Sequence, residues 1–170
     1  MYFRLSFYLV TGFIKKHVPT TIMKEDFDYK QVPHNYVHCL HAQCQSSAEC
    51  LHFLVTQYAT PEIKFFPALN PTHIISKGGV CPYFHQDQME CFALGITHLF
   101  DNLPYKKALK VRRMLYLHLK RNTFYRIQRK ERLINPAELS LIREVFQKEG
   151  IQEEPLFDEF IYKYNWEPNN

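Results

Sequence analysis

Apolar residues recur at helical spacing in the second half of the chain. Ala108, Val111, Leu115 and Leu119 fall on one side of a helix, and basic residues occupy the opposite side. A second helix is expected to begin at Thr123, whose hydroxyl can accept a capping hydrogen bond. The pattern therefore predicts two helices that share a polar turn near residues 120–122.

A third helix is predicted after residue 134. Asn135, Pro136 and Glu138 occupy the typical N-cap, N1 and N3 positions of a helix start. Leu139, Ile142 and Phe146 follow on one face, and Gly150 ends the helix.

The first half predicts fewer regular elements. Ser46 and Glu49 form a capping-box pattern for a helix over about 47–58, and a further helix is expected over 89–103. Short strands fit residues 63–66 and 73–76, between prolines. The aromatic, acidic segment 155–166 is expected to dock onto the rest. The predicted fold is mainly α with at most a small β element: a compact helical domain with a cysteine-containing N-terminal part and a basic, helix-turn-helix-like C-terminal part.

Three segments are expected along the chain. Residues 1–22 contain an apolar run of about ten residues, about half the length that spans a bilayer. The composition changes at Met23, so residues 1–22 are interpreted as a dispensable or spurious extension, ahead of a loosely packed appendage or a signal peptide. Residues 23–104 form the cysteine-containing part and 105–170 the basic part. No membrane association is predicted, and the expected location is the cytoplasm.

The net charge of +4 conceals an uneven distribution. Between Tyr105 and Arg132 there are eleven Lys or Arg residues and one acid, Glu131. The rest of the chain carries ten basic and sixteen acidic residues. Such asymmetry concerns binding partners rather than the fold, and it favours DNA or RNA, or otherwise an acidic protein.

Four of the five cysteines are candidate metal ligands. They are Cys39, Cys44, Cys50 and Cys81, and we expect their sulfur atoms to converge within about 4 Å of one another. Four thiolates suit zinc, which is preferred over an iron–sulfur cluster because no redox motif accompanies them. Cys91, within the predicted helix 89–103, should be buried and excluded from the site. The nearby histidines that could replace a ligand are His38, His41, His52 and His85.

Other interpretations of the thiols remain open. Free cysteine is often buried, and the spacing C-x4-C-x5-C is not that of a standard zinc finger. Buried or partly reactive thiols are as well supported as metal, and disulfides are less so. Cys39 beside His41 is a weak nucleophile–base pair, and the sequence has no recognised catalytic motif, so an enzyme is not predicted.

Residues 121–146 resemble the recognition end of a repressor-like helix-turn-helix. The resemblance predicts that Phe124 and Ile127 face the core and that polar residues reach nucleic acid. Arg and Gln suit base edges, whereas Lys and Arg suit phosphates. Lys130, where such proteins usually have Gly, departs from the pattern, and a solvated basic face is an equally good interpretation. The candidate nucleic-acid-binding residues are Lys120, Arg121, Asn122, Thr123, Tyr125, Arg126, Gln128, Arg129 and Lys130.

Four segments also resemble an uncharacterised family of small proteins from Bacteroidetes-type bacteria. They read "CLHAQCQSSAECL", "GVCPYF", "FYRIQRKERLINPAEL" and "PLFDEFIYKYNW". The resemblance runs from Met23 to Trp166 and implies one module, but it implies no activity. The leading hypothesis is a cytoplasmic nucleic-acid-binding regulator. The alternative is a protein-interaction or stress-associated module with a structural thiol or metal site.

Overall fold

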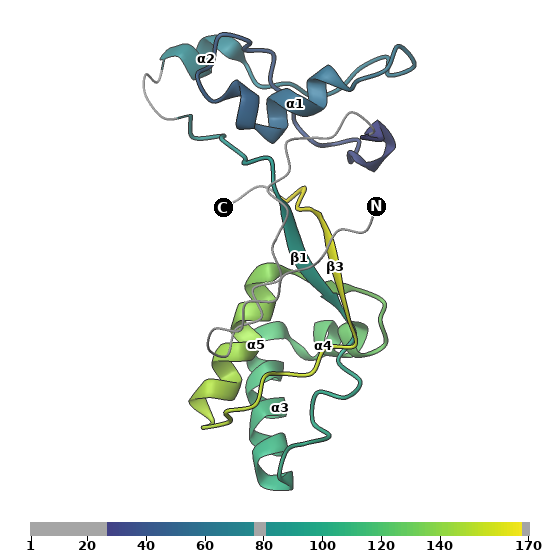
Figure 1. The fold of residues 1–170 in the computed structure, drawn as a ribbon, viewed down its shortest axis with the longest axis vertical. Coiled ribbons are helices and arrows are strands. Elements are labelled where there is room, and N and C mark those ends of the chain that lie inside the picture. The colour runs from purple at the N-terminus through teal and green to yellow at the C-terminus, as the bar shows by residue number, and fades with distance from the viewer. Residues whose placement is uncertain (1–26, 77–80, 168–170) are drawn as a thin grey trace, which may run out of the picture.

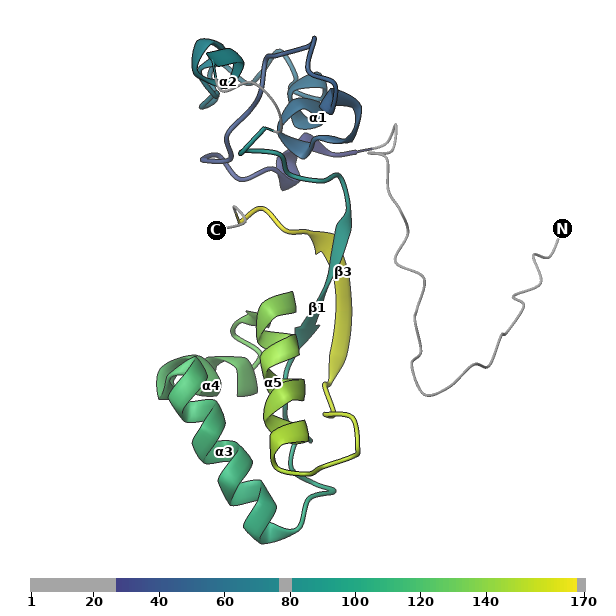
Figure 2. The same cartoon turned by 90° about the vertical axis from the view of Figure 1, so that its left-hand side faces the viewer.

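The computed structural model describes residues 27–76 and 81–167, which form two lobes joined by a ribbon of two strands (Figure 1). Residues 27–76 and 81–88, here the cysteine lobe, contain α1 (Leu51–Gln57) and α2 (Pro71–Ser76). Residues 95–158, here the helical lobe, lie at the other end of the elongated molecule, as the second view also shows (Figure 2). The helical lobe contains α3 (Tyr105–Leu119), α4 (Arg121–Gln128), β2 (Leu133–Ile134) and α5 (Pro136–Lys148).

The ribbon is formed by β1 (Met89–Leu94) and β3 (Glu159–Tyr164), which are antiparallel and paired along their whole length. Met89 lies opposite Tyr164 at the cysteine lobe, and Leu94 lies opposite Glu159 at the helical lobe. The two-residue strand β2 pairs with the helical-lobe end of β1, so the strand order is β2-β1-β3.

The prediction of a mainly α fold is wrong, because this three-stranded antiparallel sheet makes the chain a mixed α/β protein. The predicted helix over 89–103 is replaced by β1 and by turns. A partner strand about seventy residues away supplies the hydrogen bonds of β1, and such pairing overrides local helical spacing. The strand ends at Gly95, whose φ of +81° is unfavourable for residues with a Cβ.

Two helices of the helical lobe meet at a single residue. Lys120 has φ 62° and ψ 145°, between the end of α3 and the start of α4. Helix α4 therefore begins two residues before Thr123, and the predicted Thr123 cap is wrong. The expected inward residues Phe124 and Ile127 are buried, as predicted. The start of α5 is also confirmed, because Asn135 and Glu138 form a complete capping box.

Local predictions in the cysteine lobe were less accurate. Ser46 makes no capping hydrogen bond; a short 3-10 turn, Ser47–Glu49, precedes α1, which starts at Leu51. Residues 73–76, predicted as a strand, lie in α2, and residues 63–66 form no strand. Short helices of seven and six residues have little stability of their own, so packing decides their limits.

The two lobes have separate cores of different character. The helical-lobe core is apolar and joins all three helices to the sheet: Ala93, Ile96, Leu99, Val111, Leu115, Leu119, Phe124, Ile127, Ile134, Leu139, Ile142, Val145, Phe146 and Ile151. The cysteine-lobe core contains five buried apolar or aromatic residues: Val32, Tyr36, Leu51, Val55 and Tyr164. The last comes from β3, and Trp166 packs against the same core. The C-terminal segment thus docks as expected, and it does so as a strand.

Candidate functional site

The four predicted metal-ligand cysteines line one small pocket of the cysteine lobe, together with His41 and His52. The pocket encloses about 10 Å³, roughly the space that one water-sized sphere occupies. Cys39 and Cys50 are buried, whereas Cys44 and Cys81 are half-buried. The structure therefore brings together side chains that lie up to 42 positions apart in the sequence.

Backbone hydrogen bonds hold these cysteines in place. The Cys39 N–H donates to the His52 carbonyl in α1 over 2.8 Å, and the Cys44 N–H donates to the His41 carbonyl over 3.2 Å. Cys50 is the N-cap residue of α1 and forms an isolated antiparallel bridge with Gln86. This bridge fixes the segment that contains Cys81 beside the start of α1.

All five cysteines of the chain are free thiols. Burial raises the pKa of the Cys39 thiol, and the nearby Cys50, Cys81 and Cys44 raise it further by charge repulsion. The backbone N–H of His41 donates to the Cys39 sulfur and acts in the opposite direction.

The thiols do not form a complete metal site as they stand. Within residues 27–76 and 81–167, no group of three or more His, Cys, Asp or Glu side chains is arranged so that it could hold a metal ion. The expectation of sulfur atoms in close tetrahedral contact thus remains a prediction, whereas the shared pocket is observed. Cys91 lies outside the pocket, on β1, and is half-buried rather than buried.

The four histidines proposed as substitute ligands fall into two pairs. His38 and His85 are engaged with tyrosines: the His38 ring bonds the Tyr36 carbonyl and the Tyr29 hydroxyl, and His85 Nδ1 lies 2.9 Å from the Tyr36 hydroxyl. Burial lowers the pKa of both histidines, so both are neutral near pH 7. His38 and His85 therefore belong to the polar core of the lobe rather than to the pocket.

His41 and His52 line the pocket. His41 Nδ1 is buried and has no hydrogen-bond partner among the described residues. His52 Nδ1 donates to the Val37 carbonyl, so in its neutral form Nε2 carries no proton and can accept a hydrogen bond or bind a cation. Burial lowers the pKa of His52, which favours this neutral form.

The nine candidate nucleic-acid-binding residues are only partly available on the surface. Lys120, Arg121, Asn122 and Arg126 are exposed, whereas the side chains of Thr123, Tyr125 and Gln128 are half-buried in α4. The Tyr125 hydroxyl accepts a hydrogen bond from the Tyr116 hydroxyl over 3.1 Å, and the Arg121 guanidinium lies 5.8 Å from the centre of the Tyr125 ring. The remaining two, Arg129 and Lys130, pair with Glu131 and Asp158.

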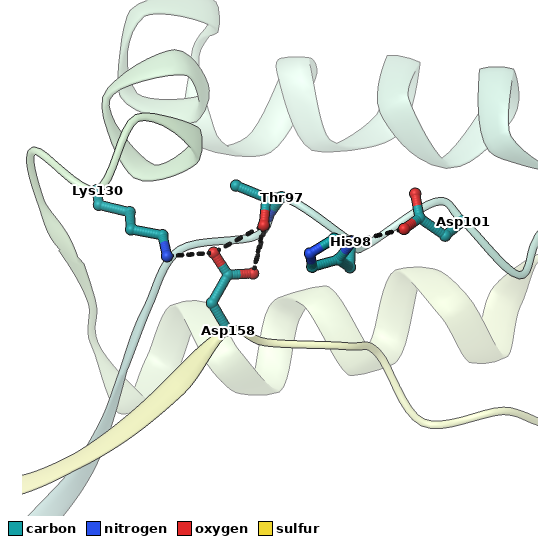
Figure 3. Close-up of polar contacts among 5 residues, drawn as sticks. All are labelled: Thr97, His98, Asp101, Lys130 and Asp158. Carbon is teal, nitrogen blue, oxygen red and sulfur yellow. Dashed lines mark hydrogen bonds and ion pairs between the residues drawn. The ribbon is translucent and has the colours of Figure 1, made fainter.

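The Lys130 contact belongs to a polar corner where three segments meet (Figure 3). Lys130 Nζ lies 3.0 Å from Asp158 Oδ2, and Thr97 donates to the same carboxylate through its N–H and its hydroxyl. Although burial of Asp158 acts to raise its pKa, these contacts outweigh it and hold the pKa below the usual range. An alanine Cβ at Gly95 would lie 2.3 Å from Asp158 Oδ2. The corner thus holds the segments that follow β1 and precede β3 against the end of α4. The contact with Asp158 also explains why Lys130 can occupy a turn at φ 61°.

Helix α3 carries an apolar strip that the sequence interpretation did not identify. Tyr105, Leu109 and Leu117 are 77%, 48% and 70% exposed. They share the outer side of α3 with Lys106 and Arg113, since residues four apart are neighbours on a helix surface. The sequence shows these apolar residues within the basic stretch. The sequence interpretation assigned only the other apolar strip of the helix, which is buried, and so left this one out.

Comparisons with known proteins place the chain among proteins without an assigned role. A family model described as "Family of unknown function (DUF6078)" matches residues 23–166. No curated protein matches the chain, and no solved structure matches it. The helices in the described part of the chain lack the combination of length and apolar character that crossing a bilayer requires.

Proposed function

We propose that this chain, which belongs to the DUF6078 family of unknown function, is a binding protein that docks an acidic protein segment on the outer face of α3 and the start of α4. The observation that carries the proposal is the exposure of Tyr105, Leu109 and Leu117 beside Lys106 and Arg113, whose side chains make no hydrogen bond, ion pair or ring contact with other described residues.

Four cations of α3, of α4 and of the residue between them are free to meet a partner, and Arg126 among them lies in the last turn of α4. Among the described residues, the side chains of Lys106, Arg113, Lys120 and Arg126 make no hydrogen bond, ion pair or ring contact. The other cations of residues 105–132 are engaged, for example Lys107 with the Gly150 carbonyl and Arg132 with Glu138. Free cations beside exposed apolar side chains complement a segment that combines Asp or Glu with Leu or Phe.

The apolar strip favours protein over nucleic acid. Phosphates attract the free Lys and Arg residues, but a duplex surface provides no general docking site for exposed Leu109 and Leu117. An amphipathic helix or strand of a partner can cover these leucines, and each buried leucine side chain contributes about 1.5–3 kcal/mol before the costs of association. Nucleic acid, recognised through Lys120, Arg121, Asn122 and Arg126, is the second candidate.

Selection of peptides from a random displayed library on the full chain tests the proposal. The enriched peptides should carry a net negative charge and at least one large apolar residue. Leu109→Ser with Leu117→Ser should weaken their binding at least tenfold, about 1.4 kcal/mol. The matched control is Phe65→Ser, which removes an apolar side chain that is 74% exposed on the other lobe and should have no effect.

Substitution of two cations distinguishes a protein partner from nucleic acid. Lys106→Ala with Arg113→Ala should slow association with the acidic peptides and reduce its dependence on salt, whereas Lys64→Ala on the cysteine lobe should not. Enrichment of neutral or basic peptides, or equal binding to the leucine variant, would refute the proposal. A different outcome would establish nucleic acid as the partner instead. The chain would bind duplex DNA or RNA equally well with and without Leu109 and Leu117. In the variant Lys120→Ala with Arg126→Ala, the slope of log affinity against log salt concentration would then fall by about two units.

A further inference from the structure

We infer that the pocket between Cys39, Cys44, Cys50 and Cys81 is the site of one zinc ion, which cross-links the cysteine lobe. The inference does not depend on the proposed function, because it concerns the other lobe. It rests on the convergence of the four thiols, on the available imidazole nitrogens beside them and on the small core of the lobe.

The four cysteines come from separate segments of the lobe. Cys39 follows an extended segment, Cys44 lies in a turn, Cys50 is the N-cap of α1, and Cys81 lies in a turn closed by the Phe84 N–H donating to the Cys81 carbonyl. One ion bound to all four would connect these segments. Zinc binds four thiolates tetrahedrally at about 2.3 Å, and a structural site of this kind has no open position.

The core of the lobe supports the need for such a cross-link. Five buried apolar or aromatic residues form it, one of which belongs to β3, and the helices have only seven and six residues. Small cores rarely stabilise a fold unaided, and proteins supplement them with disulfides or metals. All five cysteines of this chain are free thiols, so no disulfide supplements this core in the structure.

The chemistry of the pocket also fits a cation. Four cysteine side chains line a pocket that holds about one water-sized sphere, and thiolate sulfur is a preferred zinc ligand. Zinc binding releases the thiol protons, because the metal binds the thiolate form. The His41 N–H already donates to the Cys39 sulfur, and such donors stabilise a metal-bound thiolate.

His41 and His52 supply alternatives to one thiol. The buried His41 Nδ1 has no partner among the described residues, and His52 Nε2 is left without a proton when Nδ1 donates to the Val37 carbonyl. The four thiols are not arranged as a closed set in this structure, so binding must draw the half-buried Cys44 and Cys81 toward Cys39 and Cys50. Both moving cysteines lie in turns, where side chains adjust more easily than in a packed helix.

Titration of the reduced, metal-free full chain with cobalt(II) tests the inference. We expect one cobalt(II) ion per chain, with the intense visible bands of a tetrahedral site and thiolate-to-cobalt charge-transfer absorption, and stoichiometric displacement by zinc. Cys44→Ser should weaken cobalt binding at least tenfold and reduce the charge-transfer absorption. Cys91→Ser is the matched control, because it removes a half-buried thiol outside the pocket, and it should bind as the unaltered chain does.

A second measurement serves if the cysteine variants fail to fold. Trp166 is the only tryptophan and packs against Tyr36 and Tyr164 of the cysteine-lobe core, so its fluorescence reports the folding of that lobe. Zinc should raise the melting temperature seen by Trp166 in the unaltered chain. No cobalt binding at stoichiometric concentration, octahedral cobalt without thiolate absorption, or equal losses in Cys44→Ser and Cys91→Ser would each overturn the inference.

Discussion

The two lobes differ in the kinds of side chain that form their cores. The helical lobe buries a continuous aliphatic and aromatic core that three helices share with the sheet. The cysteine lobe buries few apolar residues and adds His38, His85 and Asp87, and its pocket collects thiols. A large apolar core is stable over a wide range of conditions, whereas a core of histidines and thiols depends on pH and on any bound cation. We therefore expect the helical lobe to act as the apolar scaffold, and the stability of the cysteine lobe to respond to pH and to a bound cation.

The largest effect is expected from a cavity in the helical lobe. Ile142 lies on the inward side of α5 and is fully buried in the helical-lobe core. Ile142→Ala should therefore lower the free energy of unfolding by about 2–5 kcal/mol. Denaturant unfolding followed by far-ultraviolet circular dichroism measures this loss. The exposed Leu156→Ala is the control and should change the free energy of unfolding by less than about 0.5 kcal/mol. Equal losses in both variants would show that the helical lobe is not the apolar scaffold described.

Loss of the polar corner should rank second. The Asp158 side chain is 8% exposed and accepts hydrogen bonds from Thr97 and Lys130. Asp158→Ala should therefore lower the free energy of unfolding by about 2–3 kcal/mol, in the range for hydrogen bonds that involve charged groups. Asp101 provides a matched comparison, because its side chain is 57% exposed and pairs with exposed His98. Asp101→Ala should lower the free energy of unfolding by less than about 0.5 kcal/mol. If it lowers the free energy of unfolding as much as Asp158→Ala does, the polar corner has no special role in stability.

Acidification should distinguish the lobes directly. Burial lowers the pKa of His38, His52 and His85 from the ordinary value of 6.5. The unfolded chain therefore binds more protons, so the stability of the cysteine lobe is full above about pH 6.5 and falls as the pH drops below it. We therefore expect the cysteine lobe to lose stability progressively as the pH is lowered below about 6.5.

Trp166 fluorescence measures the cysteine-lobe transition, and circular dichroism follows the helices. In the helical lobe, the low pKa of Asp158 places its loss of stability below about pH 4, outside this window. If both signals weaken together between pH 7 and pH 5, the lobes do not differ in their sensitivity to acid.

The smallest effect is expected at the start of α5. The Asn135 side chain accepts a hydrogen bond from the Glu138 N–H over 2.8 Å, so Asn135→Ala should cost about 1 kcal/mol. Asn122→Ala, in the exposed first turn of α4, is the matched control, because Asn122 makes no capping hydrogen bond. Thermal unfolding at neutral pH measures both variants. Equal shifts in melting temperature would mean that the cap has no influence of its own.

Predictions that depend on neighbouring residues were the most accurate. Asn135, Pro136 and Glu138 specify the start of α5, since a capping box satisfies donors within one helical turn. The buried sides of α3 and α4 were also readable from apolar spacing. The same logic failed at Ser46, which makes no capping hydrogen bond, and at Thr123, which lies inside α4 because that helix begins at Arg121.

Predictions that depend on distant segments were less accurate. Residues 89–94 have a spacing compatible with a helix, yet they pair with residues 159–164 as β1 and β3. The exposed strip of α3 was missed because one apolar face was enough to explain the helix. The availability of Lys130 was overestimated, because its partner Asp158 lies in a segment 28 residues away.

The sequence by itself determined the basic segment, the limits of α5 and the inward faces of α3 and α4. These features depend on composition and on contacts within a few turns of helix. Only the tertiary structure decided that the chain has a sheet, that the four cysteines share a pocket, and which cations remain free. Those outcomes require segments far apart in the chain to meet, and the entropy cost of bringing them together is offset only by the packing of the complete fold.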